Sequence, residues 1–555
     1  NAEVTETNMM DETPPETLSM TTRDGVRLDA DVYRPAIAGD YPVLLMRQPY
    51  GRRIGTTVCF AHPSWYAAHG YIVVIQDVRG RGTSEGIFSL FEQETADGED
   101  TIAWAAALPG STGVVGMYGF SYQGVTQLLA AASLPPALKA IAPTMIGWDL
   151  RKDWAYENGA FCLAANISWA VQLAAQNAKH VGDAEAFAEL AEASRNLALG
   201  RANHARPDLL QRHADHAPFY RDWLERDFAD PYWDRISPAA SVEPLTTKGP
   251  AALFVSGWYD THLPGTVAAY RAYEKAGLVD AALVVGPWTH FPWGRRLGGK
   301  DFGDEAIGRI DQLQVSWFDH HLKGTTREML PTAPVRLFDM GSNGWRDFPA
   351  WPNDAESWQI ASGGRATLDE RDGRLGPSPE VDATADHLVH DPWRAVPTTG
   401  GAFGALPGPV DRTDVDARPD VLTYTSAPLD APLLLPGEII AQLAICADCP
   451  SVDLCCILTL VDADGRSRHL TEGYAHFPAT PDSAASVSLR PTCATVPAGG
   501  RLRLAISAAS FPAYPINPGN GRRPVDAGVE EASIITLRLA LAESRLVLPI
   551  MKGEA

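Results

Sequence analysis

The chain has 555 residues, of which 45% are hydrophobic and 21% are charged. These proportions are ordinary for globular proteins, so they exclude a disordered or fibrous chain, and the length exceeds what one hydrophobic core accommodates. The formal net charge of −22 opposes association with phosphate backbones and with anionic membrane surfaces. We therefore expect several domains, no nucleic-acid partner and no membrane partner.

The amino-terminal segment is acidic and polar, and no run of roughly 18 apolar residues occurs in the chain. The segment has neither the basic start nor the apolar middle of a secretion signal. These features favour a cytoplasmic protein. Because the first residue is Asn1 rather than Met, earlier removal of a leader stays open.

The first predicted element is a β-hairpin near residues 18–34, where apolar and polar residues alternate around an Asp-Gly turn. Short apolar runs rich in β-branched residues then alternate with helix-like segments, an order typical of a parallel α/β sheet whose strands are buried on both faces. The predicted strand segments are 41–51, 71–82, 112–121, 138–145, 250–260 and 280–290.

Between about Gly147 and Ser241 the strand pattern stops, and Ala, Leu and Trp recur with helical spacing. We predict an all-helical insertion that forms a cap over the sheet. The sheet pattern resumes afterwards and ends with a helical pattern that reaches Gly324. The sequence thus predicts an α/β-hydrolase catalytic domain over 1–146 and 242–351, and a helical cap domain over 147–241.

From residue 352 the composition shifts to Gly, Pro, Asp and Thr with short alternating runs, which predicts a jelly-roll β-sandwich over 352–555. Cys446, Cys449, Cys455 and Cys456 lie close together within this region. Zinc sites usually show two clean CxxC or His pairs, whereas LCCILTL is typical of a buried strand, so we favour packing in the sandwich core. We expect neither a disulfide framework nor a bound metal.

Ser121 lies where an apolar strand segment meets a helix-like one, in the sequence GFSYQG. Such a sharp turn, called a nucleophile elbow, needs small neighbours and lifts the serine hydroxyl above the sheet edge at a helix N-terminus. The general pattern has its second glycine two residues after the serine, but Gly124 comes three residues after it. A plain helix N-cap is the alternative for Ser121. We predict that it is a nucleophile.

A serine hydroxyl needs a histidine base, and the base needs a carboxylate that fixes its tautomer. In α/β-hydrolases the order along the chain is serine, acid, histidine. Asp260 and His290 end the two predicted strands that follow Ser121, which matches this order. Taken singly, Asp260 could be a turn residue and His290 a surface histidine. The rival base, His262, is too near Asp260 in sequence to sit on a separate loop.

Acyl transfer also needs hydrogen-bond donors aimed at the tetrahedral oxyanion. We expect one from the backbone N–H of Tyr122, the residue after the predicted nucleophile. The loop that follows the early strand offers Tyr50, through its phenol or a backbone group. Packing of Tyr50 against the cap is the alternative.

The chain resembles the cocaine-esterase and X-Pro dipeptidyl-peptidase family of hydrolases over nearly its whole length. The resemblance is carried by TTRDGVRLDADVYRP, RQPYG, QDVRGRGTSEG, GFSYQG, SGWYD, GPWTH and FDHHLKG, and in the last domain by GPVDR, DVLTYTS and SAASFPAY. Within this family a glycine three residues after the serine is normal. The resemblance implies a catalytic Ser121, Asp260 and His290, and an oxyanion hole made by the Tyr50 hydroxyl and the Tyr122 N–H.

The same resemblance implies a substrate pocket in the cap. In cocaine esterase two cap tryptophans help to line the site for an aromatic acyl group, and Trp154 and Trp169 match them with the same separation. Phe403 of the third domain is a further candidate wall. Members that act on α-amino acid esters carry Gln-Glu after the acid, whereas this chain has Thr261 and His262. His262 is therefore a candidate pocket residue, with packing or a surface role as the alternative.

The leading hypothesis is a serine hydrolase that cleaves a small-molecule carboxylic ester, or an activated amide, and accepts an apolar, aromatic acyl group. The alternatives are an amidase or acylase, an X-Pro dipeptidyl-peptidase, and a non-catalytic binding protein. We expect no cofactor. A homodimer is left open, and the substrate is not specified by fold and triad.

Overall fold

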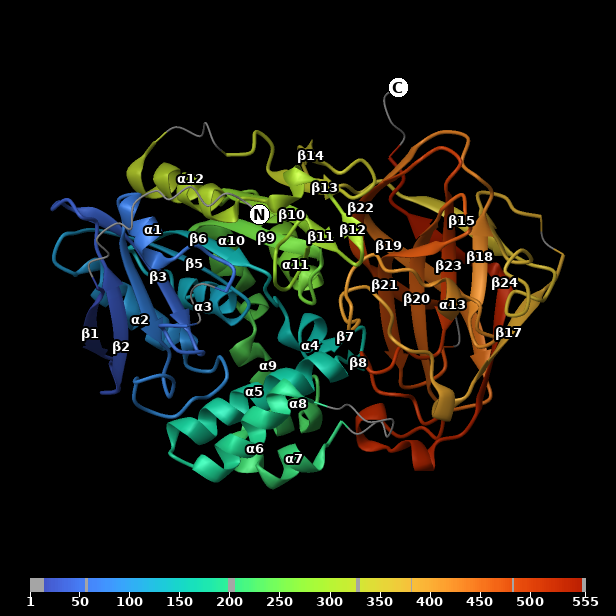
Figure 1. The fold of residues 1–555 in the computed structure, drawn as a ribbon, viewed down its shortest axis with the longest axis horizontal. Coiled ribbons are helices and arrows are strands. Elements are labelled where there is room, and N and C mark those ends of the chain that lie inside the picture. Colours follow the sequence, from blue (N-terminus) through green and yellow to red (C-terminus); the bar gives the residue numbers. More distant parts are fainter. Residues whose placement is uncertain are drawn as a thin grey trace.

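The computed structural model describes residues 14–54, 58–197, 205–325, 330–380, 382–481 and 484–551. Three groups of elements lie side by side in Figure 1: an α/β unit, a set of helices at the bottom, and a β-rich unit on the right. The residue boundaries predicted for these groups stay a prediction.

Ten strands form the first sheet (Figure 1). In spatial order they are β1 (Glu16–Thr21), β2 (Arg27–Tyr33), β4 (Ile72–Asp77), β3 (Tyr41–Gln48), β5 (Ser111–Phe120), β6 (Leu138–Thr144), β9 (Ala251–Tyr259), β10 (Ala281–Thr289), β13 (Val335–Asp339) and β14 (Gly344–Phe348). From β4 to β13 every neighbouring pair is parallel. The predicted parallel sheet and the hairpin of β1 and β2 are confirmed.

Helices cover both faces of this sheet. On one face lie α2 (Glu94–Ala106), α3 (Tyr122–Ala131) and α11 (Leu263–Ala276), and on the other lie α1 (Pro63–Ala68) and α12 (Ile310–Lys323). Because successive residues of a strand point to opposite faces, Leu45 belongs to the first core and Met46 to the second. Burial on both faces explains why these strands are continuously apolar.

The helices that form the insertion between β6 and β9 lie mostly at the bottom of Figure 1. They are α4 (Leu150–Asp153), α5 (Leu163–His180), α6 (Ala184–Arg195), α7 (Asp208–Arg212), α8 (Pro218–Glu225) and α9 (Pro231–Ile236), whereas α10 (Val242–Lys248) lies beside the sheet and contacts α11. The prediction of helices alone was wrong at one place, where β7 (Tyr156–Glu157) and β8 (Ala160–Phe161) form a short hairpin. Its turn is Asn158-Gly159, with φ of 45° and 80°, a pair that favours tight hairpin turns.

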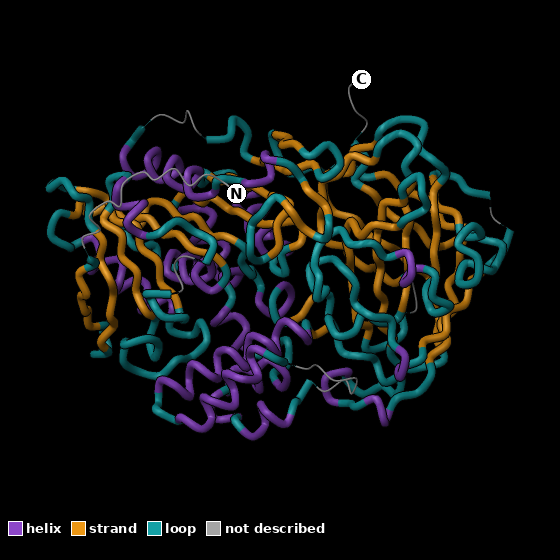
Figure 2. The backbone as a smooth tube through the Cα atoms, in the orientation of Figure 1, coloured by secondary structure: helices purple, strands orange, loops and turns teal. Residues whose placement is uncertain are grey.

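The third group is a second ten-stranded sheet, visible in Figure 2 as the strand-rich half. Nine strands follow the order β21 (Ser467–Phe477), β20 (Val452–Val461), β23 (Arg501–Ser507), β18 (Leu422–Ser426), β16 (Arg374–Gly376), β15 (Glu356–Ala361), β24 (Ile535–Leu548), β19 (Leu433–Ala447) and β22 (Ala485–Val496), while β17 (Ala385–His390) pairs with β24. The short elements β11 (Arg296–Leu297), β12 (Lys300–Asp301) and α13 (Thr413–Asp416) lie outside the two sheets.

The two ends of this order meet, since Thr471 Oγ1 of β21 donates to the carbonyl of Arg490 in β22 at 2.6 Å. The two end strands are thus in contact, although no strand pairing joins them among the described residues. The predicted combination of an α/β-hydrolase fold with a jelly-roll sandwich is confirmed. All seven cysteines are free. Cys455 and Cys456 lie in different cores on opposite faces of β20. No helix in the described part of the chain is both long and apolar enough to span a bilayer.

Candidate active site

Ser121 lies between β5 and α3 with φ 59° and ψ −126°. This backbone conformation is uncommon for a residue other than glycine and is found mainly where function requires it. A Cβ at Gly119 would lie 2.5 Å from Gln123 Cβ, and a Cβ at Gly124 would lie 2.3 Å from Ile146 Cγ2. Both glycines are thus needed for the close packing of the turn, and Gly124 lets α3 approach the segment that follows β6.

Asp260 and His290 follow the neighbouring parallel strands β9 and β10, so both leave the same edge of the sheet. His290 Nδ1 donates to Asp260 Oδ1 at 2.8 Å, and Ser256 Oγ donates to Asp260 Oδ2 at 3.0 Å. Burial on its own raises the pKa of the Asp260 carboxyl, but the hydrogen bond and the charge of His290 outweigh burial and hold this pKa below its usual value. Asp260 is therefore ionised beside the imidazole.

The histidine also reaches the serine elbow. Its ring centroid lies 5.4 Å from that of Phe120, the residue before Ser121. Within the described part of the chain, the side chains of Ser121 and His290 do not form a direct hydrogen bond. Catalytic hydrogen bonds are often long before substrate binds. The structure thus joins Asp260 and His290 by a hydrogen bond, and the turn that carries Ser121 lies next to His290.

Tyr50 follows β3, and its hydroxyl accepts a hydrogen bond from Trp169 Nε1 of α5 at 3.1 Å. Burial raises the pKa of Tyr50 to about 12, although the bond from Trp169 and the charge of Arg81 act in the opposite direction. The phenol is therefore protonated at neutral pH. Its hydroxyl hydrogen remains available for donation, because the bond from Trp169 uses the oxygen only as an acceptor.

Tyr122 begins α3, so its backbone N–H belongs to the first turn, where no intrahelical partner exists. Its side chain serves a different purpose: the hydroxyl donates to Glu94 Oε1 at 2.7 Å, and Glu94 pairs with the buried Arg47. Burial, and then the charge of Glu94, raise the pKa of the Tyr122 phenol well above its usual value. Only the backbone of Tyr122 is free for an oxyanion.

Aromatic rings surround the region next to Tyr50. Trp154 lies after α4 and Trp169 on α5, with ring centroids 5.2 Å apart. Phe91 was not predicted from the sequence, yet its ring lies 5.6 Å from Trp154, 6.5 Å from Trp169 and 4.3 Å from the stacked ring of Tyr122. The two predicted tryptophans are thus brought together by a third aromatic residue from the loop before α2.

His262 packs between the cap and the predicted base. Its ring stacks on Trp154 at 4.0 Å and lies 5.1 Å from the ring of His290, edge to face. Burial, followed by the proximity of His290, lowers the pKa of His262 to about 3. A histidine with so low a pKa is a poor general base at neutral pH, which favours His290 over its rival.

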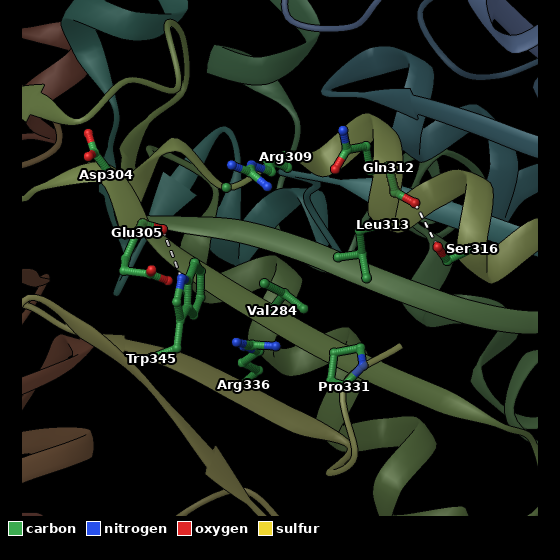
Figure 3. Close-up of a pocket in the computed structure, with 11 residues that line it drawn as sticks. Val284, Asp304, Glu305, Arg309, Gln312, Leu313, Ser316, Pro331, Arg336 and Trp345 are labelled. Carbon is green, nitrogen blue, oxygen red and sulfur yellow. Dashed lines mark hydrogen bonds between the residues drawn. The ribbon is translucent and has the colours of Figure 1, made fainter. Parts of the chain in front are cut away.

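A cavity of about 420 Å³ lies at a different place, where β10, β14 and the start of α12 meet. Figure 3 shows the residues that line it. Trp345 forms one wall and donates Nε1 to the carbonyl of Glu305 at 2.9 Å. The charged lining residues are Arg309, Arg336, Asp304 and Glu305. Its lining includes none of the predicted site residues. The cavity is therefore separate from the candidate active site.

One cluster has the residue types of a metal site. Asp280, His320 and His321 each place a candidate ligand atom within 4.8 Å of the others. Asp280 precedes β10, whereas His290 follows it. The cluster thus lies at the opposite end of the strand from the predicted base and takes no part in the candidate site.

Comparison with known proteins identifies the family. Residues 24–292 match X-Pro dipeptidyl-peptidase (S15 family), and residues 329–546 match the X-Pro dipeptidyl-peptidase C-terminal non-catalytic domain. The chain is 31% identical to cocaine esterase from Rhodococcus sp. over 96% of its length and 97% of that protein. The chain belongs to this family. It is thus a member of a hydrolase family of serine esterases and peptidases, as the sequence motifs predicted.

Other family relatives agree with this assignment. A putative serine esterase from Mycobacterium bovis is 27% identical over 90% of the chain and 91% of that protein. Among solved structures, an α-amino acid ester hydrolase has a TM-score of 0.81 at 22% identity and covers 99% of both chains. An aminopeptidase from a Thaumarchaeota archaeon has a TM-score of 0.81 at 21% identity over 100% of this chain and 99% of that one. At these identities the two structures support the fold alone.

Phe403, the last predicted pocket residue, lies between β17 and β18 of the second sheet. Its ring lies 5.6 Å from that of Tyr514, and the guanidinium of Arg490 lies 4.8 Å from its centroid. It packs in a small core with Cys162 of the insertion. A role of Phe403 in substrate binding stays a prediction.

Proposed function

We propose that the protein is a serine carboxylic-ester hydrolase that forms an acyl-enzyme on Ser121. One observation carries the proposal: the buried Asp260 holds His290 by a 2.8 Å hydrogen bond at the sheet edge where the strained Ser121 elbow lies. This is the arrangement in which an imidazole can accept the proton of a serine hydroxyl.

In the first half of the reaction, His290 Nε2 removes the proton from Ser121 Oγ as the oxygen attacks the ester carbonyl. Asp260 stabilises the imidazolium that results and keeps the proton on Nδ1. The imidazolium then protonates the leaving alcohol as the carbon–oxygen ester bond breaks. In the second half, His290 takes a proton from water, the hydroxide attacks the acyl carbonyl, and Ser121 leaves with the proton returned by His290.

The negative oxygen of each tetrahedral intermediate is proposed to accept hydrogen bonds from the Tyr50 hydroxyl and the Tyr122 N–H. The pKa of about 12 supports Tyr50 as a neutral donor. Trp169 supports its orientation, because the indole N–H donates to the same hydroxyl at 3.1 Å. The position of Tyr122 in the first turn of α3 adds the favourable end of the helix dipole.

The acyl group is proposed to contact Trp154 and Trp169, behind which the buried ring of Phe91 packs. Their clustered rings offer an apolar surface of the kind that binds an aromatic acid. The substrate class is thus a small ester, or an activated amide, of an apolar and preferably aromatic acid.

The structure offers less support for an X-Pro dipeptidyl-peptidase or another enzyme that recognises a free amine. Such a site needs an available carboxylate, and two buried carboxylates of the cap are already engaged. Asp153 accepts hydrogen bonds from the backbone N–H groups of Trp148 and Asp149, each at 2.9 Å. Glu157 pairs with Arg490 at 2.5 Å. An acylase that cleaves an amide without a free amine is the second candidate. Such a substrate needs no free carboxylate in the site, so the engagement of Asp153 and Glu157 does not count against it.

The proposal is tested by hydrolysis of p-nitrophenyl esters and by covalent labelling with a fluorophosphonate, read by mass spectrometry. The wild type should turn over the ester and carry one adduct on Ser121. Ser121→Ala should keep its melting temperature and lose both signals. An unlabelled wild type would instead support a non-catalytic binding protein. Parallel assays of an aryl ester, a glutaryl amide and an Xaa-Pro anilide rank the three enzymatic alternatives.

A further inference from the structure

Strand β22 of the sandwich contains a β-bulge whose extra residue is part of the sequence Arg490-Pro491. Its pairing with β19 passes from Gly437↔Thr492 to Ile439↔Leu489, so Arg490 and Pro491 together face the single residue Glu438. A bulge changes the direction in which a side chain leaves the strand. The carbonyl of Arg490 is not left without a partner, because Thr471 Oγ1 donates to it at 2.6 Å.

The side chain of Arg490 extends from this bulge to the loop that carries the predicted catalytic acid. Nη1 donates to the carbonyl of Asp260 at 2.7 Å, and Nη2 donates to the carbonyl of Thr261 at 2.9 Å. These two carbonyls belong to the three-residue link, Asp260 to His262, between β9 and α11. One guanidinium therefore holds two successive peptide groups of that link.

The same guanidinium also contacts the cap. Nη2 lies 2.5 Å from Glu157 Oε2 in β7, and the Tyr514 hydroxyl donates to the same oxygen at 3.4 Å. The side chains of Arg490 and Glu157 are only 2% and 8% exposed. Burying two charges is costly unless they are paired and hydrogen-bonded. Because Arg490 Nε is buried without a partner, the two Nη groups make all the hydrogen bonds that compensate the buried guanidinium, and their contacts depend on one another. Arg490 thus joins the sandwich, the acid loop and the β7–β8 hairpin at one point.

We propose that Arg490 is a positioning residue for catalysis, which acts by holding the Asp260–Thr261 backbone so that the Asp260 carboxylate meets His290. The inference rests on the function proposed above. It assigns a contribution to the reaction to a domain whose family description is non-catalytic. Without the guanidinium, the Asp260 carbonyl retains only the N–H of Leu263, at 3.3 Å. His262, on the same link, would lose its fixed position against Trp154 as well.

The decisive variants are Arg490→Gln and the double variant Arg490→Gln/Glu157→Gln. The single variant leaves Glu157 without its partner, whereas the double variant removes both buried charges. Both should lower kcat by roughly 10- to 100-fold with little change in KM, because displacement of a catalytic group by about 1 Å has this effect. Both should also displace the lower apparent pKa of the kcat/KM profile. Arg490→Lys should recover part of the loss, since an ammonium can still donate to one carbonyl.

Two controls separate positioning from stability. Arg503 is another buried arginine of the sandwich, and its side chain contacts Thr425, Glu370 and Asp416, which all lie in that unit. Arg503→Gln should lower the melting temperature and leave kcat and the pH profile unchanged. Glu157→Gln alone should keep kcat within about threefold of the wild type, because the two carbonyl contacts persist.

The inference is overturned if Arg490→Gln leaves kcat and the pH profile unchanged, or if Glu157→Gln alone reproduces the whole loss. The rate of fluorophosphonate labelling of Ser121 gives a second readout that needs no known substrate. If the wild type is labelled and Arg490→Gln is labelled at the same rate, the positioning role is contradicted but the proposed function is not. An unlabelled wild type counts against the proposed function itself.

Discussion

The imidazole of His262 stacks on the indole of Trp154, with ring centroids 4.0 Å apart and planes inclined by 16°. His290, whose ring lies 5.1 Å away, instead has its Nδ1 bound to the buried Asp260. The two histidines are thus neighbours with different surroundings. One is held neutral by packing, whereas the other is oriented by a carboxylate.

This difference predicts that substitution of His290 lowers kcat far more than substitution of His262. His290→Gln should lower kcat by about 10⁴-fold or more, as expected when the base of a triad is removed. His262→Phe preserves an aromatic ring against Trp154 and should keep kcat within about tenfold, since its low pKa makes it a poor base. Steady-state turnover of an aryl ester checks both. A larger loss in His262→Phe than in His290→Gln would assign the base to His262.

Tyr50 and Tyr122 offer a matched pair for testing the oxyanion hole. Tyr50→Phe removes the proposed donor and should lower kcat by roughly 10²- to 10³-fold, with KM nearly unchanged. Tyr122→Phe keeps the backbone N–H and loses the hydroxyl, which donates to Glu94 and accepts from the Phe91 N–H at 3.5 Å. It should cost about 1–2 kcal/mol of unfolding free energy and leave kcat near the wild-type value. A normal kcat for Tyr50→Phe would show that its phenol only packs against Trp169.

The aromatic cluster predicts acyl selectivity. Trp154→Leu should lower the ratio of kcat/KM for a p-nitrophenyl benzoate over a p-nitrophenyl acetate by roughly 10- to 100-fold, because an apolar contact contributes about 1–3 kcal/mol to discrimination. The ratio cancels any change in the amount of folded enzyme. Trp345→Leu, in the cavity of Figure 3, is the control and should leave the ratio unchanged. An unaltered ratio in Trp154→Leu would remove the acyl pocket from the cap.

Asp339 lies at the contact between the two sheets, and its pKa predicts how the unfolding free energy depends on pH. This buried residue ends β13 and accepts hydrogen bonds from Thr495 of β22, from Arg346 and from Ser342. Burial on its own raises the pKa of the carboxyl, but these bonds outweigh burial and lower it to about 2. The folded-state pKa of Asp339 is below the unfolded value of about 3.9. The contribution of this carboxylate to the unfolding free energy is therefore complete above pH 4 and is lost as the pH falls from about 4 towards 2.

The shift corresponds to at most about 3 kcal/mol of unfolding free energy. Asp339→Asn should therefore lower stability at pH 7 and flatten the decline between pH 4 and pH 2. Urea denaturation across this range measures both effects. A decline as steep in Asp339→Asn as in the wild type would assign the acid sensitivity to other carboxyls.

Most of the fold could be predicted from local sequence. Apolar runs that alternate with helical segments specify a parallel sheet, and GFSYQG places a tight turn between a strand and a helix. The order Ser121, Asp260, His290 then indicated the chemistry, since each residue ends a predicted strand. The hairpin around Asn158-Gly159 had a usable signal too, because Asn-Gly favours a tight turn. The helical spacing of the residues on both sides hides this signal.

Contacts between segments far apart in the chain could not be predicted in this way. Phe91 joins the tryptophan cluster from a loop with no periodic pattern, and the low pKa of His262 arises from burial under the cap. Arg490 is 230 residues from Asp260 along the chain, and the Arg-Pro step in its strand has no visible connection to the acid loop. The turn at Ser121 is decided by neighbouring residues, whereas the groups that orient Asp260 and enclose the acyl site meet only when three parts of the chain pack together.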